Sequence, residues 1–178
     1  MNRHDATRLS VVWEWHDDSY DRAQITQNHD GWHITGRHGE TRYVITLDAG
    51  FCCRTLEASH GTHALTLNRT KSGWLTEKAE LVAQSAQVAH LDLGWTALTN
   101  TFPIKCLQAT EQTTGVFDVL MVTLPNLDIS VVPQSYTQQD HGWLYQNKAS
   151  GFSANLTIDK NGLVTDYPGL CTQKDLGP

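Results

Sequence analysis

The feature that most constrains the fold is a strict alternation of apolar and polar residues within short segments. From Phe152 to Ile158 every even-numbered position is apolar, and residues 127–131 alternate in the same way. A two-residue period of this kind is typical of β-strands that bury one face. The sequence therefore predicts a chain made mostly of strands, each presenting one face to a core.

Turn residues connect these segments into predicted hairpins. The strongest turn signal is Asp159-Lys160-Asn161-Gly162, because an Asn-Gly pair readily adopts positive φ. Weaker turn signals are Gly36-Arg37-His38-Gly39 and Ser59-His60-Gly61. The predicted hairpins pair residues 32–35 with 43–47, 54–58 with 62–67, and 152–158 with 163–165.

The segment from Ala79 to Ala89 has two interpretations. Its Ala, Leu, Gln and Glu residues suit a helix of about three turns. Alternate positions, beginning with Leu81 and Ala83, fit a strand or an extended loop equally well. Both interpretations stay open at this point.

About ten strands with at most one or two short helices predict an all-β, mainly antiparallel fold. A sheet of more than a handful of strands has to curl or split. We therefore expect a curled sheet in the form of a β-roll or unclosed barrel, with a concave apolar face where a ligand would bind. No repeat, low-complexity tract or linker divides the chain, so residues 1–178 are expected to form a single domain.

Charge and hydropathy exclude several classes of partner. A net charge of −6 argues against binding to nucleic acid, and no basic patch is visible that would draw the chain to an anionic membrane. No stretch approaches the roughly 20 apolar residues that span a bilayer, so an integral membrane protein is not expected. The first ten residues are polar rather than leader-like, and four cysteines without an export signal favour free thiols. We expect a soluble cytoplasmic protein.

Motifs for catalysis and cofactor binding are missing from the sequence. The segment Gly151-Phe152-Ser153-Ala154-Asn155 has Asn where a nucleophile elbow requires Gly. There is no phosphate loop, dinucleotide fingerprint or Cys-x-x-Cys pair. His60 and His63 flank a turn, but a zinc site needs three or four converging ligands. The favoured interpretation is that these two histidines are exposed turn residues. No catalytic residue, metal or cofactor is predicted.

Three polar-aromatic segments interrupt the strand-like sequence: residues 99–104, 134–137 and 162–169. In the first, Thr and Asn side chains can bond to nearby backbone, and Pro103 favours extended geometry at Phe102. One interpretation is a rigid bend that crosses the inside of the curled sheet. The other is a binding site in which Asn100 and the Thr hydroxyls meet a ligand's polar head, with Trp95 or Phe102 as a stacking face.

With these segments the chain resembles the bacterial "putative glycolipid-binding" protein family from Trp13 to Leu170. The resemblance implies a β-roll or unclosed barrel, similar to the half-barrels of bacterial lipoprotein carriers. It also implies a non-enzymatic protein that binds a glycolipid or another amphiphile in a concave cavity. It rests on Leu91-Asp92-Leu93, Thr99 to Ile104, Leu124-Pro125, Gln134 to Thr137, Asp159 and Gly162 to Gly169, with Tyr43, Asp48 and Arg54. The candidates for a shared ligand-binding site are Asp92, Thr99, Asn100, Thr101, Asp166 and Tyr167.

The chain departs from the family pattern just after Ile104. Two Arg residues are usual there, whereas this chain has Lys105 and Cys106. Lys keeps a charge without the planar fork of Arg, and Cys removes the charge.

Two alternative functions stay open. The first is an enzyme that acts on a small polar or sugar-like substrate through Asp and His residues, for which the acidic cluster Asp17, Asp18 and Asp21 is a candidate. The second is a protein-interaction module that pairs an exposed sheet edge with another chain. The sequence does not predict an oligomeric state.

Overall fold

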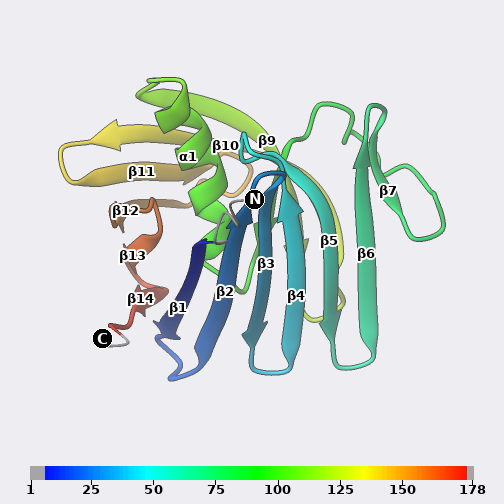
Figure 1. The fold of residues 1–178 in the computed structure, drawn as a ribbon, viewed down its shortest axis with the longest axis horizontal. Coiled ribbons are helices and arrows are strands. Elements are labelled where there is room, and N and C mark those ends of the chain that lie inside the picture. Colours follow the sequence, from blue (N-terminus) through cyan, green and yellow to red (C-terminus); the bar gives the residue numbers. More distant parts are fainter. Residues whose placement is uncertain (1–6, 176–178) are drawn as a thin grey trace, which may run out of the picture.

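The computed structural model describes residues 7–175 and forms one continuous sheet of 14 strands (Figure 1). The strand order is β7-β6-β5-β4-β3-β2-β1-β14-β13-β12-β11-β10-β9-β8. Among the strand pairs of residues 7–175, β8 and β9 are the only parallel pair, and all others are antiparallel. The elements are β1 (Thr7–Trp15), β2 (Tyr20–Asn28), β3 (Gly31–His38), β4 (Thr41–Leu47), β5 (Cys53–His60), β6 (His63–Thr70), β7 (Gly73–Thr76), β8 (His90–Leu93), η1 (Leu98–Asn100), α1 (Thr101–Ala109), β9 (Thr114–Thr123), β10 (Asp128–Gln139), β11 (Gly142–Asn147), β12 (Ser153–Ile158), β13 (Val164–Tyr167) and β14 (Cys171–Gln173).

The sheet curls around α1 and does not close, since β7 and β8 are its two ends (Figure 1). The segment before β8 reaches back to the start of β5, where the Cys53 amide donates to the Ala89 carbonyl at 2.8 Å. The strand order and the pairing directions confirm the predicted all-β, mainly antiparallel, curled and open sheet. The number of strands is larger than the ten expected, in part because β8 and β14 have only four and three residues and carry little pattern of their own.

The seam of the sheet lies between β1 and β13, where the last strand of the fold, β14, is inserted. Trp13, Glu14 and Trp15 pair with Gln173, Thr172 and Cys171, respectively. The Trp13 indole N–H also donates to the Val164 carbonyl of β13 at 2.7 Å. The first and last strands of the chain are therefore neighbours in the sheet.

The concave face is built from side chains in register on adjacent strands. Leu9, Ile25, Ile34 and Ile45 lie side by side across β1, β2, β3 and β4. Ile34 and Ile45 are fully buried, and burying a side chain of this size contributes about 1.5–3 kcal/mol. The predicted alternation thus produces an apolar inner face.

The three predicted hairpins are confirmed as β3–β4, β5–β6 and β12–β13. In the last one, Asp159 Oδ1 accepts the backbone N–H groups of Asn161 at 2.8 Å and Leu163 at 2.9 Å. Gly162 has φ +80°, a conformation that a residue with a Cβ rarely adopts. The Asp-x-Asn-Gly sequence specifies this turn through both effects.

The ambiguous segment 79–89 is an extended loop and contains no helix. Ala79 and Gln84 have φ values of +60° and +61°, which a helix excludes. The loop is held to β7 because the Trp74 indole donates to the Val88 carbonyl at 2.9 Å and the Val82 amide donates to the Trp74 carbonyl at 2.8 Å. Tertiary hydrogen bonds therefore override its helical composition.

The segment 99–104 does cross the inside of the curled sheet, but the prediction of a bend with an extended Phe102 was wrong. It contains the end of η1 and the start of α1, and Pro103 is the third residue of that helix. Proline is tolerated in the first turn because the N–H groups there have no partner within the helix. Phe102 and Ile104 are buried against the concave face.

A buried carboxyl group ties the loop just before η1 to the sheet. Tyr43 extends across β3 above Gly36, where a Cβ would lie 2.0 Å from the tyrosine Cζ. Its hydroxyl donates to Asp21 Oδ1 at 2.9 Å, and Thr96 Oγ1 donates to Asp21 Oδ2 at 2.5 Å. Burial raises the pKa of Asp21 to about 6, although both hydrogen bonds oppose this shift.

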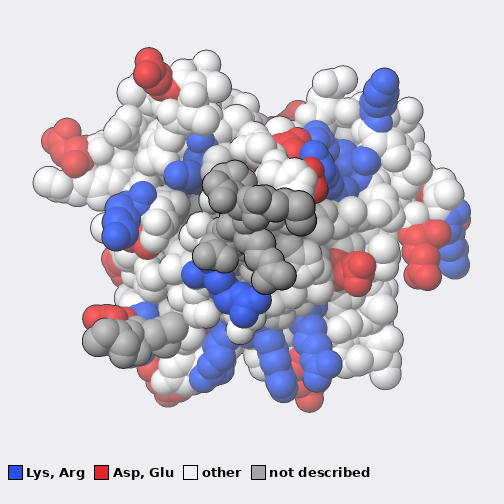
Figure 2. Space-filling model, in the orientation of Figure 1, with Lys and Arg blue, Asp and Glu red and all other residues white. Residues whose placement is uncertain are grey.

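The convex face carries a row of three arginines that is not visible in the linear sequence. Arg22 pairs with Arg37, and Arg37 with Arg42, on β2, β3 and β4. All three are exposed, and none of the ion pairs found in residues 7–175 includes them. Figure 2 shows basic side chains along the lower edge of the molecule, where these strands end. The register, not the spacing along the chain, creates this basic patch.

Two further findings concern the whole described chain. The four cysteines are free thiols, with Cys53 and Cys171 buried and Cys52 and Cys106 half-buried. Across residues 7–175 no helix has the length and apolar character needed to span a membrane.

Candidate functional site

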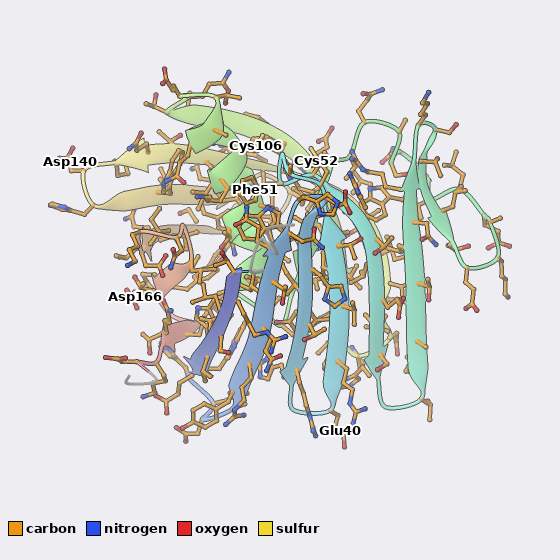
Figure 3. All side chains as sticks on the ribbon, viewed as in Figure 1. Glu40, Phe51, Cys52, Cys106, Asp140 and Asp166 are labelled. Carbon is orange, nitrogen blue, oxygen red and sulfur yellow. The ribbon has the colours of Figure 1, made fainter. Side chains whose placement is uncertain are left out.

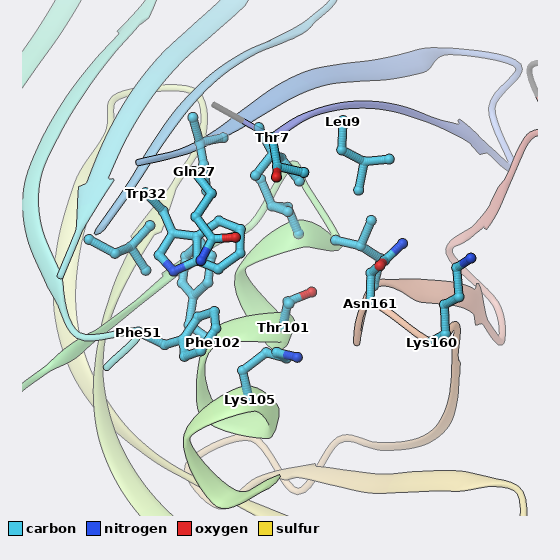
Figure 4. A pocket seen from close by; sticks show the side chains of 15 residues that line it. Thr7, Leu9, Gln27, Trp32, Phe51, Thr101, Phe102, Lys105, Lys160 and Asn161 are labelled. Atoms are coloured by element: carbon cyan, nitrogen blue, oxygen red, sulfur yellow. The ribbon is translucent and has the colours of Figure 1, made fainter. Parts of the chain in front are cut away.

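A pocket of about 190 Å³ lies between the concave face of β1–β4, the helix α1 and the β12–β13 turn (Figure 4). Its mouth carries polar and cationic side chains, and its deeper walls are apolar. The lining residues are Thr7, Leu9, Ile25, Gln27, Trp32, Ile34, Leu47, Phe51, Leu98, Thr101, Phe102, Lys105, Lys160, Asn161 and Leu163.

Strand register and helix periodicity place these side chains together. Two rows of paired residues form the sheet wall, Leu9–Ile25–Ile34 and Gln27–Trp32–Leu47. The opposite wall comes from Leu98, Thr101, Phe102 and Lys105, whose spacing of three, four and seven residues is that of one helix face. Each wall is therefore a regular element, which gives the pocket a fixed shape.

Two buried polar atoms of pocket-lining residues lack partners. Thr101 is 6% exposed, and its Oγ1 makes no hydrogen bond with any described residue. The same holds for Nε1 of Trp32. An unpaired buried polar group costs about 1–3 kcal/mol, so a ligand that pairs with these atoms would recover that free energy.

A rigid loop holds Phe51 at one side of the pocket. Asp48 Oδ1 accepts the amides of Gly50 at 2.9 Å and Cys52 at 3.0 Å, and Phe51 between them has φ +64°. The Phe51 ring lies 5.2 Å from the Trp32 ring, between centroids, and 5.5 Å from Lys105 Nζ. Phe51 thus connects the sheet wall to the cation on α1.

The β12–β13 turn forms the other side. A Cβ on Gly162 would lie 2.6 Å from Lys105 Cδ, so the lysine stem packs directly on the glycine. Lys160 and Asn161 precede Gly162 in this turn and line the mouth. The two polar segments around residues 99–104 and 162–169 therefore do meet, through Lys105 and Gly162.

Three of the six predicted site residues lie outside the pocket in a hydrogen-bond network of their own. Gln134 Nε2 donates to Asp92 Oδ2 at 2.5 Å, and Thr99 Oγ1 donates to Asp92 Oδ1 at 3.4 Å. The Tyr136 hydroxyl donates to Asn100 Oδ1 at 3.0 Å. Burial raises the pKa of Asp92, against the effect of its two hydrogen bonds. The network joins the segments 99–104 and 134–137, with Asn100, Gln134 and Tyr136 buried and Asp92 half-buried.

The other predicted residues divide between three places. Thr101 lines the pocket. Tyr167 is buried in an aromatic cluster, 6.2 Å from Tyr145, whose ring is 5.4 Å from that of Tyr136. Asp166 is half-buried on β13, at the side of the molecule (Figure 3). The structure therefore does not bring the six candidates together.

Sequence reasoning missed Trp32, Phe51, Lys105 and Lys160 as pocket residues. Phe102, predicted as a stacking face, does line the pocket, whereas Trp95 is buried outside it. Lys160 lies in the strongest turn signal, but no pattern shows which element a turn faces. Lys105 lies four residues after Thr101 on the same face of α1, but the sequence did not predict this helix and so gave no signal for it.

The described pocket lining includes neither a carboxylate nor an imidazole, so it contains no acid–base pair. No group of three His, Cys, Asp or Glu residues within 7–175 could hold a metal ion. The nearest approach to a nucleophile and base is Ser19 Oγ, 2.6 Å from His38 Nε2. The same hydroxyl donates to Asp17 at 2.5 Å, and His38 Nδ1 donates to the Trp95 carbonyl at 2.7 Å. These bonds tie the β1–β2 turn to β3, outside the pocket.

The model of a family described as "Putative glycolipid-binding" matches residues 10–173. The chain belongs to this family. The crystal structure of a DUF1089 family protein from Pseudomonas aeruginosa is similar, with 25% identity and a TM-score of 0.65. The similarity covers 96% of this chain and 94% of that one, so it extends over the whole curled sheet. No curated protein matches the chain.

Proposed function

We propose that this protein is a non-enzymatic binder of an amphiphile, whose apolar part occupies the pocket between β1–β4 and α1. The observation that carries the proposal is the division of the pocket into an apolar interior and a polar mouth. Ligand sites are typically apolar cavities with a few polar groups that fix orientation. The description of the family as glycolipid-binding supports the same class of ligand.

The size of the pocket limits what it can hold. Ligand pockets typically measure about 300–1,000 Å³, and this one measures about 190 Å³. It therefore suits one short alkyl chain or the end of a longer one, with the head group at the mouth. Two full acyl chains would require the sheet and α1 to move apart.

The alternative functions receive less support. An enzyme would need an acid–base pair at the pocket, and the described lining has none. A β-pairing module would need a long free edge, but β7 and β8 have four residues each. The β7 edge is also partly covered by a bridge from Leu75 to Leu81. Short, covered edges discourage pairing with another chain.

A variant that fills the pocket tests the proposal. Leu9→Trp adds bulk to the sheet wall, whereas Ser10→Trp adds the same side chain to the convex face and serves as the matched control. Single-chain C8 and C10 amphiphiles are titrated calorimetrically below their micelle concentrations. We expect binding by the wild type and Ser10→Trp and at least a tenfold loss for Leu9→Trp. Equal binding by both variants, or no binding by the wild type, would contradict the proposal.

A further inference from the structure

We infer that the head group of the ligand is an anion, a carboxylate or phosphate, bound at the pocket mouth between Lys105 and Lys160. This inference rests on the proposed amphiphile binding and adds the chemical class of the head group. Figure 4 shows both lysines at the pocket, one from α1 and one from the β12–β13 turn.

The first argument is the local charge. The chain has 19 acidic and 13 basic residues, yet the described pocket lining has two lysines and no acid. The ion pairs of residues 7–175 include neither Lys105 nor Lys160. Asp159, next to Lys160 in the chain, uses its Oδ1 to accept the Asn161 and Leu163 amides. An anion between the two ammonium groups would supply the missing negative charge.

The second argument is the balance of donors and acceptors. Lys105, Lys160 and the Trp32 indole can only donate hydrogen bonds. Thr101 can donate as well, and its Oγ1 and the Trp32 Nε1 have no partner among the described residues. A carboxylate or phosphate only accepts, so it matches a set of donors. A sugar hydroxyl needs acceptors as well as donors, and the lining side chains offer these only through Gln27, Asn161 and threonine hydroxyls.

The third argument is that Lys105 is held in place before any ligand binds. Its stem packs on Gly162, and its Nζ lies 5.5 Å from the centroid of the Phe51 ring. Phe51 in turn belongs to the loop fixed by Asp48. Side chains that are already ordered lose less conformational entropy on binding. This favours Lys105 as the primary contact and the more exposed Lys160 as the second.

The test uses ligands with one tail and different heads. Octanoate, octyl phosphate, octyl glucoside and octyltrimethylammonium are titrated calorimetrically into the wild type, Lys105→Gln, Lys160→Gln and Lys105→Arg. Lys71→Gln, in the β6–β7 turn, is the control for a lost surface charge. We expect octanoate or octyl phosphate to bind at least tenfold more tightly than octyl glucoside, and the stronger of the two identifies the head group.

The variants give the second readout. Lys105→Gln should weaken anion binding about tenfold and Lys160→Gln about threefold, while both leave octyl glucoside within twofold. Lys105→Arg should retain most of the anion affinity, which shows that charge is needed and that the helix is intact. If octyl glucoside or the ammonium ligand binds best, the head-group inference is overturned and the proposed function stands. If no ligand of the four binds, both are overturned.

Discussion

Two buried groups on the concave side predict opposing effects of pH on stability. Burial raises the pKa of Asp21 to about 6 and lowers that of His90 to about 4, from ordinary values of 3.8 and 6.5. Each shift corresponds to about 3 kcal/mol, at about 1.4 kcal/mol per pKa unit. Both residues are almost completely buried, so solvent screening does not reduce these figures much.

The signs follow from which state binds more protons. Between pH 4 and 6 folded Asp21 is protonated and unfolded Asp21 is not, so its contribution to the free energy of unfolding falls as pH rises. For His90 the unfolded chain binds the extra proton between pH 4 and 6.5, so its contribution rises with pH. The two effects nearly cancel in the wild type, and each becomes visible when the other group is removed.

The assay is urea unfolding followed by tryptophan fluorescence at several values from pH 4 to pH 7. Relative to wild type, Asp21→Asn should gain about 2–3 kcal/mol of unfolding free energy between pH 4 and pH 7. His90→Gln should lose about the same amount over the same range. Comparing each variant with wild type at equal pH cancels the other titrating groups. A change below 1 kcal/mol, or one of the opposite sign, would refute the reasoning.

Three further predictions concern single contacts and can be measured by the same urea unfolding. Arg37→Thr should raise the unfolding free energy by about 0.5–1 kcal/mol in 20 mM salt and by less in 0.5 M salt, because it removes like charges from facing positions; a lower stability in 20 mM salt would contradict this. Gly162→Ala should cost about 1 kcal/mol more than Gly61→Ala, since both have positive φ but only Gly162 also faces a close side chain. Tyr136→Phe should cost about 1–3 kcal/mol of unfolding free energy, because it leaves buried Asn100 without its donor. Tyr20 is half-buried, so Tyr20→Phe should cost under 1 kcal/mol. Equal losses for the two glycine variants, or for the two tyrosine variants, would contradict the corresponding explanation.

The fold could be predicted because its information is local. Alternation over residues 152–158 reports one buried face directly, and the Asp159–Gly162 turn is specified by its own side chains. The helix α1 could not be predicted in this way. Its sequence has a Pro at the third position and Thr and Asn before it, and it is helical because its apolar residues fill the curled sheet.

The site could be predicted only in part, because it depends on register. The candidates Asp92, Thr99 and Asn100 came from the family resemblance, and they form a hydrogen-bond network with Gln134 and Tyr136 instead of lining the pocket. The pocket combines side chains from β1–β4, α1 and a distant turn, whose proximity no local pattern encodes. The arginine row on the convex face arises in the same way, from pairing between strands.

The position of β14 has a consequence for how the chain folds. Strands β1 to β7 are neighbours in chain order, so this half of the sheet can assemble from successive hairpins during synthesis. Within the sheet, the other half, from β13 to β8, is joined to it by the pairing of residues 171–173 with residues 13–15. The pocket lies across this junction, since Lys160 and Asn161 come from the second half. Ligand binding would therefore report completion of the whole sheet, and a chain truncated before β14 would hold two partial sheets without a finished site.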